Sequence, residues 1–289
     1  MSRPILVTGM PRSGTTWLAR LLATASGTAL AGREPMNPRA RQYALAGTLH
    51  GWAKLTSLTP RQQRALRLAY RGWNPFVFSR YGRRQWAAPL PGTRLVMKDP
   101  FAMLSVPVVA ATTGAIPVLL YRHPGAALAS YRRMGWAPDL GELAPILDEH
   151  RAARAVTARP LPRPDKVGEA EAMGQFWSAL YEIAIDNAEQ SADLIVVSHE
   201  ELASGGVAAT GRLFDALALT WREGTDLELS RESRAPQSGS SRTLHNFDRA
   251  PSEVAGGWRR ELTPDELRAI EAATTSIRAR LQALRLVLA

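Results

Sequence analysis

The chain contains no cysteine among its 289 residues. This absence excludes disulfides, thiolate metal sites and catalysis by a cysteine thiolate. No apolar run is long enough to span a bilayer, and the N-terminus leads directly into the strand-like sequence PILVTG without the features of a signal peptide. We therefore expect a cytoplasmic protein, with the periphery of a membrane as a second location left open.

Acidic residues are missing from one long segment. None occurs between Glu34 and Asp99, whereas this interval contains twelve Lys and Arg residues. The net charge of +10 comes entirely from this segment, because the remainder has 24 basic and 26 acidic residues. A field of one sign attracts anions such as nucleotides, acidic acceptors, anionic lipids or nucleic acids. A solvated arginine-rich face is an equally good interpretation of the same pattern.

Short apolar runs alternate with helical patterns along the chain. The expected strands are 5–9, a short strand ending at Glu34, 93–99, 115–123 and 193–200. Strands that alternate with helices predict an α/β fold in which a parallel β-sheet is flanked by helices on both faces. The length and the 45% of apolar residues fit one domain over residues 1–289.

A basic, aromatic-rich helical insertion at about 37–92 separates the second and third strands. Its helix has Thr59 as a candidate N-cap and Pro60 at the first position. Four arginines share one helix face: Arg61, Arg64, Arg67 and Arg71. The aromatic residues can line a pocket or pack, and we expect each of them in the core: Tyr43, Trp52, Tyr70, Trp73, Phe76, Phe78, Tyr81 and Trp86.

The segment VTGMPRSGTTWLARLL, residues 7–22, has the form of a phosphate-binding loop between a strand and a helix. Four residues separate Gly9 from Gly14, and the lysine that commonly follows the second glycine is replaced by Thr15. Glycines allow backbone N–H groups to face an anion at the positive end of the following helix. The loop predicts an anion site in which Gly14, Thr15 and Thr16 offer donors and Arg12 a charge. The family resemblance described next adds Ser13 and Trp17 to the expected nucleotide-binding residues.

The string PRSGTTWL resembles the 5′-phosphosulfate loop of sulfotransferases, which use 3′-phosphoadenosine 5′-phosphosulfate (PAPS) as donor. That family carries, after a later strand, an arginine followed eight residues on by a serine for the 3′-phosphate. YRHPGAALASY supplies Arg122 and Ser130 at this spacing. Either residue alone is explained by an arginine closing a strand or a serine in a helix. Both matches together favour this family. The resemblance implies that the chain has a fold of the P-loop nucleotide-binding type.

The sequence VMKDPF, residues 96–101, resembles the Lys-Asp-Pro-Phe of tyrosylprotein sulfotransferases and their bacterial relatives. The resemblance implies that Lys98 touches the leaving phosphate and the bridging oxygen. The histidine that serves as base in cytosolic sulfotransferases would stand at Pro100 and is absent. For Asp99 we favour a structural role, as a helix cap or as a salt-bridge partner of Lys98 or Arg122.

The resemblance to these relatives implies Glu34, in AGREPMNP, as the general base. A structural ion pair of Glu34 with Arg33 or Arg12 is the alternative. Arg12 would join Lys98 in stabilising the departing nucleotide.

Family features are weaker in the second half of the chain. The adenine-side segment reads SHEEL, which leaves His199 to stack or hydrogen-bond where the family has tyrosine. Of the C-terminal motif only Gly256 and Trp258 remain. We expect Arg242 or Arg249, from the polar and mobile loop at 230–253, to replace the missing basic pair.

The resemblance implies transfer of a sulfuryl group from PAPS to a hydroxyl or amine, without a required metal. Among acceptors we rank a glycolipid or other small hydroxylated molecule first, a polysaccharide second and protein tyrosine last. Two alternatives stay open. One is a Mg-ATP-dependent P-loop small-molecule kinase, and the other is a non-catalytic module around 39–84 that binds nucleic acid or a membrane surface. We expect no nucleic-acid partner, and the sequence does not predict an oligomeric state.

Overall fold

A computed structural model describes residues 2–38, 44–45, 47–78, 82–188, 191, 193–230 and 256–288. The expectations for Tyr43, Tyr81, Arg242 and Arg249, and for most of the 230–253 loop, lie outside these residues.

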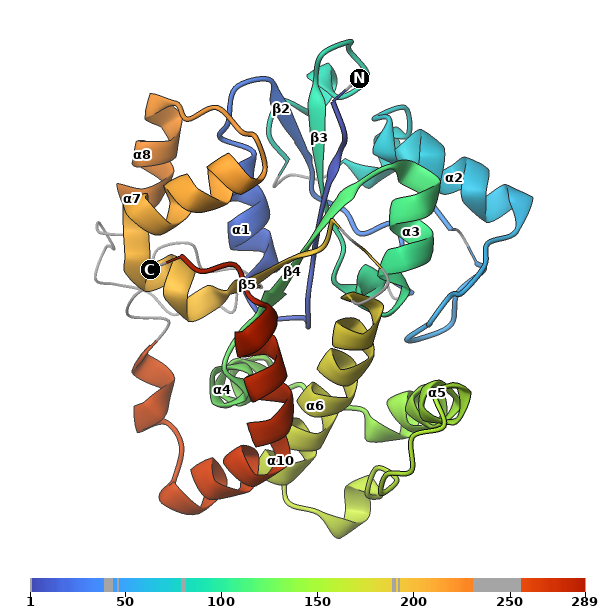
Figure 1. Cartoon of the computed structure of the whole chain (residues 1–289), viewed down its shortest axis with the longest axis vertical. Coiled ribbons are helices and arrows are strands. Elements are labelled where there is room, and N and C mark those ends of the chain that lie inside the picture. The colour runs from blue at the N-terminus through green and yellow to red at the C-terminus, as the bar shows by residue number, and fades with distance from the viewer. Residues whose placement is uncertain are drawn as a thin grey trace.

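Five parallel strands form one sheet in the order β2-β3-β1-β4-β5 (Figure 1). The strands are β1 (Ile5–Thr8), β2 (Thr28–Ala31), β3 (Arg94–Lys98), β4 (Ile116–Tyr121) and β5 (Ile195–Ser198). This order places β1 at the centre, so that the loop after it opens at the middle of the carboxyl edge of the sheet. The parallel α/β architecture predicted from the sequence is confirmed.

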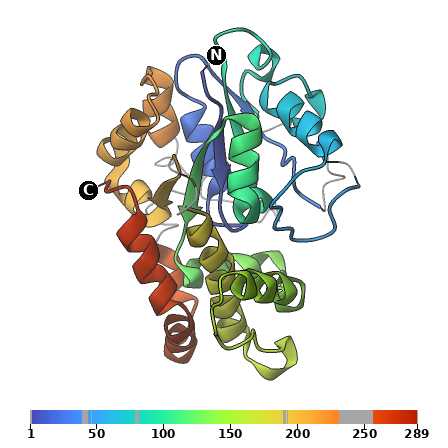
Figure 2. The same ribbon diagram turned by 45° about the vertical axis from the view of Figure 1, so that its right-hand side comes forward.

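The strands are buried along their whole length because helices cover both faces. Ile5 and Val7 pack with the side chains of α1 and α7, whereas Leu6 packs with those of α2 on the opposite face. In Figure 2 the blue helix α1 and the green helix α3 lie on opposite sides of the sheet. The continuous apolar runs in the sequence reflect this burial on two faces.

The α-helices divide into those beside the sheet and those beyond its carboxyl edge (Figure 1). Beside the sheet lie α1 (Thr15–Leu22), α2 (Pro60–Tyr70), α3 (Val106–Thr113), α7 (His199–Ala216) and α8 (Glu223–Ser230). Beyond the edge lie α4 (Pro124–Met134), α5 (Leu140–Ala153), α6 (Glu169–Ala188) and α10 (Pro264–Leu284). Short 3₁₀ turns are η1 (Pro75–Val77), η2 (Gln85–Ala87), η3 (Pro100–Ser105), η4 (Pro164–Lys166) and η6 (Gly257–Arg260).

Helices α6 and α10 pack closely along one another in the layer beyond the sheet (Figure 1). A Cβ added to Gly174 would come within 2.8 Å of the Ala273 Cβ, so the absence of a side chain allows this approach. The Ser178 hydroxyl donates to the Ala273 carbonyl at 2.7 Å. This layer places the start of α4 and the body of α6 opposite the carboxyl edge of the sheet.

Two helix starts follow the sequence closely. Thr59 and Thr263 each form a capping box, with the side chain accepting from the backbone N–H three residues on and with proline in the first turn. The second strand, in contrast, ends at Ala31, three residues before the expected end at Glu34. Its continuation leaves the sheet because the Arg33 N–H bonds to the Val77 carbonyl of η1.

The expectation that every aromatic residue of the segment between β2 and β3 lies in the core is wrong. Trp52 and Tyr70 are buried, but Trp73, Phe76 and Trp86 are 59%, 65% and 72% exposed. Their positions explain this result. All three follow the end of α2, on turns that run along edge strand β2 through the Arg33–Val77 and Leu30–Arg83 hydrogen bonds. The arginine face of α2 is exposed.

Within the described ranges no helix combines the length and the apolar character needed to cross a membrane.

Candidate active site

The loop between β1 and α1 packs tightly against the neighbouring strand and helix. Gly9 has φ +143°, and a Cβ there would lie 2.1 Å from the Leu120 carbonyl oxygen of β4. Gly14 has φ +99°, and a Cβ there would lie 2.5 Å from the His199 ring. Both glycines are therefore required by backbone conformation and by close packing, whatever the loop binds.

Among the residues that the structure describes, the first turn of α1 leaves its backbone N–H groups without a side-chain cap. Gly14 is its N-cap residue, no side chain of the described chain caps it, and its first turn carries no acidic residue. The N–H groups of such a turn have no partner within the helix and lie at the positive end of the helix dipole. Thr15 is buried at this position, and Ser13 is held by a hydrogen bond from its N–H to the Met10 carbonyl at 3.0 Å.

Three of the predicted residues meet at one side of this loop. The Arg12 Nε donates to the Ser130 hydroxyl at 3.0 Å, and an Arg122 guanidinium nitrogen donates to the Arg12 carbonyl at 3.3 Å. Arg122 directly follows β4, and Ser130 lies two turns into α4. The eight-residue spacing read from the sequence therefore brings both side chains to the loop, because α4 begins at the end of its strand.

This group carries concentrated positive charge. Burial, with the neighbouring Arg133 and Arg12, lowers the pKa of Arg122 to about 10, against the opposing effect of the Glu200 carboxylate. Burial and the charge of Arg133 also lower the pKa of Arg12. Buried cations whose charges lower the pKa of a neighbour are stabilised when an anion binds between them.

Glu34 and Lys98 form a second group at the carboxyl edge. Lys98 is the last residue of β3, and its ammonium forms an ion pair with the Glu34 carboxylate. The other Glu34 oxygen accepts from the Asn37 side-chain amide. Both carboxylate oxygens are therefore engaged, which fixes the orientation of the side chain. Both side chains are largely buried, because 10% of the Lys98 side chain and 17% of the Glu34 side chain are exposed.

Asp99 holds the backbone next to Glu34 and Lys98, and its predicted structural role as a helix cap is confirmed. Its carboxylate accepts from the Phe101 N–H at 3.1 Å as the cap of η3, and from the Met36 N–H at 2.6 Å. These bonds hold the turn that carries Glu34 against the end of β3. Burial and the nearby Glu34 charge raise the pKa of Asp99 to about 8, against the opposing effect of the two N–H groups and Lys98.

His199 begins α7, where the sequence suggested the end of a strand. The Ser198 side chain caps this helix by accepting from the Glu201 N–H, so β5 stops one residue before His199. The His199 ring packs edge-to-face against Trp17 with 5.4 Å between ring centres. Burial, with Arg122 nearby, lowers the pKa of His199 to about 3, so the ring is neutral.

The structure adds two features that sequence reasoning missed. Asn37 orients Glu34, and its only signal was its place three residues further along the same turn. Trp258 stacks on His123 with 4.3 Å between ring centres, and its ring lies within 2.4 Å of where a Gly125 Cβ would be. The remnant of the C-terminal motif is thus placed against the start of α4, which no spacing along the chain could indicate.

The model of a sulfotransferase family matches residues 4–223, more than half of the chain. The chain belongs to the sulfotransferase family. The match covers all five strands, the loop and both groups described above, and it ends before η6 and α10. No curated protein matches the chain.

Solved sulfotransferases resemble this one in fold at low sequence identity. A sulfotransferase domain from the curacin biosynthetic pathway is 15% identical, with 95% of this chain and 98% of that chain covered and a TM-score of 0.49. A mouse sulfotransferase solved in complex with PAP, 3′-phosphoadenosine 5′-phosphate, is 12% identical. The match covers 97% of this chain and 89% of that chain, with a TM-score of 0.47. One from Alicyclobacillus acidocaldarius is 15% identical, covering 99% and 98%, at 0.46. At these values no residue role is transferred from them.

Proposed function

We propose that this sulfotransferase, as one domain over its whole length, moves a sulfuryl group from PAPS to a hydroxyl or amine of a small molecule or glycolipid. The observation that carries the proposal is the Glu34–Lys98 pair at the carboxyl edge of the sheet, together with the glycine loop whose helix has no side-chain cap among the described residues. Ligands of parallel α/β sheets bind at this edge.

The residues present fit a nucleotide with two separate anionic groups. The first turn of α1, with Ser13, Gly14, Thr15 and Thr16, would hold the 5′-phosphosulfate. Arg122 and Ser130 would hold the 3′-phosphate, where the guanidinium groups depress one another's pKa. A bound phosphate would relieve that repulsion through charge-assisted hydrogen bonds.

Trp17 and His199 would contact the adenine of the nucleotide. Trp17 Nε1 and His199 Nδ1 are both buried without a hydrogen-bond partner among the described residues. Buried polar atoms of this kind are uncommon in proteins and are consistent with a ligand that completes them. Arg242 stays our proposed further contact to the 3′-phosphate, outside the described residues.

In the proposed reaction the acceptor oxygen attacks sulfur in line with the bond to the 5′-phosphate. The new bond joins that oxygen to sulfur, and the bond from sulfur to the bridging oxygen breaks with its electron pair moving to the phosphate. Glu34 takes the acceptor proton. Lys98 lies against Glu34 and is placed to stabilise the charge on the departing 3′-phosphoadenosine 5′-phosphate (PAP), with Arg12 as the second cation. We propose that no metal is needed for this step.

The exposed aromatic residues support a lipid-like acceptor. Trp73, Phe76 and Trp86 stand in the segment without acidic residues, and Arg84 lies over the Trp86 ring at 6.0 Å. Trp and Arg side chains together suit the interface of an anionic membrane. We therefore place glycolipid first among the acceptors, with the enzyme at the cytoplasmic face of a membrane.

The decisive variant is Glu34→Gln. We expect kcat to fall about 10²- to 10⁴-fold, the usual share of a general base, because the amide cannot accept the proton. The affinity for PAP should stay within about twofold, because the hydrogen bonds of the Glu34 side chain among the described residues go to Lys98 and Asn37, outside the loop. Turnover is measured with labelled PAPS over a panel of hydroxylated acceptors, and PAP binding by calorimetry.

Glu182→Gln is the matched control, because Glu182 pairs with Arg151 away from the loop. Full activity of Glu34→Gln would refute the assignment of the base. Calorimetry in EDTA tests the donor separately. Tight binding of PAP without Mg²⁺ supports PAPS, whereas ATP binding that requires Mg²⁺ would support the kinase.

A further inference from the structure

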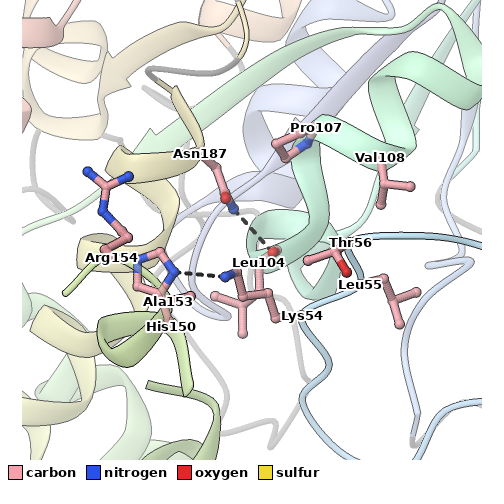
Figure 3. A pocket seen from close by; sticks show the side chains of 10 residues that line it. All are labelled: Lys54, Leu55, Thr56, Leu104, Pro107, Val108, His150, Ala153, Arg154 and Asn187. Carbon is pink, nitrogen blue, oxygen red and sulfur yellow. Dashed lines mark hydrogen bonds between the residues drawn. The ribbon is translucent and has the colours of Figure 1, made fainter. Parts of the chain in front are cut away.

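A second pocket lies away from the proposed catalytic residues. It has a volume of about 380 Å³ and opens between the turn before α2, the start of α3 and the ends of α5 and α6 (Figure 3). This volume is within the range of small-molecule sites. The lining residues are Lys54, Leu55, Thr56, Leu104, Pro107, Val108, His150, Ala153, Arg154 and Asn187. None of them belongs to the groups around the anion loop or Glu34.

Lys54 is the main cation of this pocket, and a buried histidine holds its ammonium in place. The Lys54 Nζ lies 2.8 Å from His150 Nδ1, and a dashed line in Figure 3 marks this bond. His150 Nε2 lies 2.8 Å from Asp186 Oδ2. An ammonium has only N–H donors, so Nδ1 must accept from Lys54, which requires a neutral ring. Burial also lowers the pKa of His150, against the opposing hydrogen bond to Asp186. The one proton of the ring then lies on Nε2 and is donated to Asp186, which leaves Nδ1 to accept from Lys54.

The negative charge of Asp186 is directed to other cations. One oxygen accepts from Arg280 at 2.7 Å, and the other lies 3.1 Å from Arg154 Nε as well as beside His150. For Lys54, no described carboxylate lies within 4.0 Å of the ammonium. An ammonium has three N–H donors, and the imidazole uses one. A half-buried cation without a counter-ion is costly unless an anion joins it.

The remaining wall is apolar and held in place. Leu55, Leu104, Pro107 and Val108 line one side. The turn that carries Lys54 is fixed to η3 because the Ser105 hydroxyl accepts from the Leu55 N–H at 2.8 Å and donates to the Ala53 carbonyl at 3.0 Å. The Asn187 amide donates to the Leu104 carbonyl at 3.1 Å. The pocket is therefore formed before any ligand arrives.

We propose that this pocket binds a small amphipathic anion, a carboxylate or a sulfate monoester with a short apolar chain. The anionic head would accept from the two remaining N–H donors of Lys54, and the chain would pack on the leucine, proline and valine side chains. The site lies beyond the proposed function and does not depend on it.

The presence of a lysine rather than an arginine at position 54 supports the proposed anion site. The chain has 33 arginines and three lysines, which are Lys54, Lys98 and Lys166. A compact ammonium can bond an imidazole and still present donors in other directions, whereas a guanidinium presents a planar fork. Lys54 is therefore a departure from the arginine that the chain uses almost everywhere else.

Three lysines also make a direct experiment possible. Incorporation of ¹³C-labelled lysine would label only these three side chains and leave their N–H donors intact, and Lys54→Gln and Lys166→Gln variants would assign the NMR signals. The probes are hexanoate, hexyl sulfate and hexan-1-ol, added at constant ionic strength to protein saturated with PAP. Saturation keeps the probes from the nucleotide site. Calorimetry on unlabelled protein gives the affinities.

We expect the two anions, or one of them, to shift the Lys54 signal saturably and to leave the Lys166 signal unchanged. Lys54→Gln should weaken this binding at least tenfold, whereas Lys166→Gln, which removes the same charge at an exposed site, should not. Hexan-1-ol should bind at least tenfold more weakly. The anion that binds better identifies the head group.

The proposal is overturned if neither anion shifts the Lys54 signal, if hexan-1-ol binds as tightly, or if both variants weaken binding equally. The titration of the unsubstituted protein decides the matter even if Lys54→Gln fails to fold. Turnover is not a readout here, so failure of this proposal and failure of the proposed function are distinguishable.

Discussion

Lys98 and Lys54 stand in two buried polar groups that differ in the partner of the lysine. Lys98 ends a central strand and meets the Glu34 carboxylate, which Asn37 also holds. Lys54 lies on a turn before α2 and meets the neutral ring of His150, while the nearby Asp186 is occupied by arginines. In the first group the lysine charge is neutralised within the protein, and in the second it is left for a ligand.

The difference shows that the partner, more than the residue type, decides the role of a buried cation. A lysine paired with a carboxylate is held in one orientation, and its charge is balanced. When charge develops on a reacting group nearby, this fixed pair can respond to it without rearrangement. A lysine against an imidazole keeps its full charge and its donors, which suits binding of an anion. Three changes test this distinction, in order of decreasing effect.

The largest effect is expected from Lys98→Gln. Loss of the cation beside Glu34 should lower kcat by about 10²- to 10³-fold, the usual cost of one group that stabilises developing charge. Lys166→Gln should change kcat little, because its side chain is 72% exposed and pairs only loosely with Asp165. Turnover with labelled PAPS measures both. A Lys98→Gln variant with normal kcat would remove the contrast between the two lysine groups.

A smaller effect is expected from Ser105→Ala, which releases the turn of Lys54 from η3. The variant leaves the Leu55 N–H and the Ala53 carbonyl without their buried partner. The free energy of unfolding should fall by about 1–3 kcal/mol, the usual cost of unsatisfied buried polar groups. Urea denaturation measures this change. Ser204→Ala, at an exposed serine, should have an effect below about 0.5 kcal/mol, and equal losses would show that the turn is not fixed by Ser105.

The smallest effect for a single step of one pH unit, about 1.4 kcal/mol or less, concerns the pH dependence of stability, which should have opposite signs in the two groups. The folded chain keeps a proton on Asp99 up to about pH 8, whereas the unfolded chain loses it near pH 4, so this group lowers stability as pH rises between these values. The pKa of His150 is lowered on folding, so this group lowers stability as pH falls below the unfolded value near 6.5.

Asp99→Asn should therefore flatten the decline above pH 5, and His150→Gln should flatten the decline on the acid side. Thermal unfolding from pH 4.5 to 8.5 measures both slopes. Asp165→Asn, at an exposed carboxylate, is the control. Slopes that stay as in the unsubstituted chain would show that neither group titrates differently in the folded and unfolded states.

Much of the active-site neighbourhood could be predicted from local spacing. Arg122 and Ser130 are eight residues apart on the strand-to-helix path of β4 and α4, and the fixed rise of a helix brings them to one side of the loop. Asp99 could be recognised as a cap because Pro100 follows it. The exposure of Trp73, Phe76 and Trp86 was not predictable, because an aromatic residue carries the same apolar signal in a core and on a surface.

By itself, the sequence determined the parallel sheet, the anion loop and the capped helices, since each depends on residues close along the chain. Only the tertiary structure decided that Glu34 pairs with Lys98, that Asn37 orients it and that Trp258 stacks on His123. The same holds for the Lys54 pocket, which joins segments about 130 residues apart. Such contacts arise from the packing of separate elements, and a linear pattern of side chains contains no record of that packing.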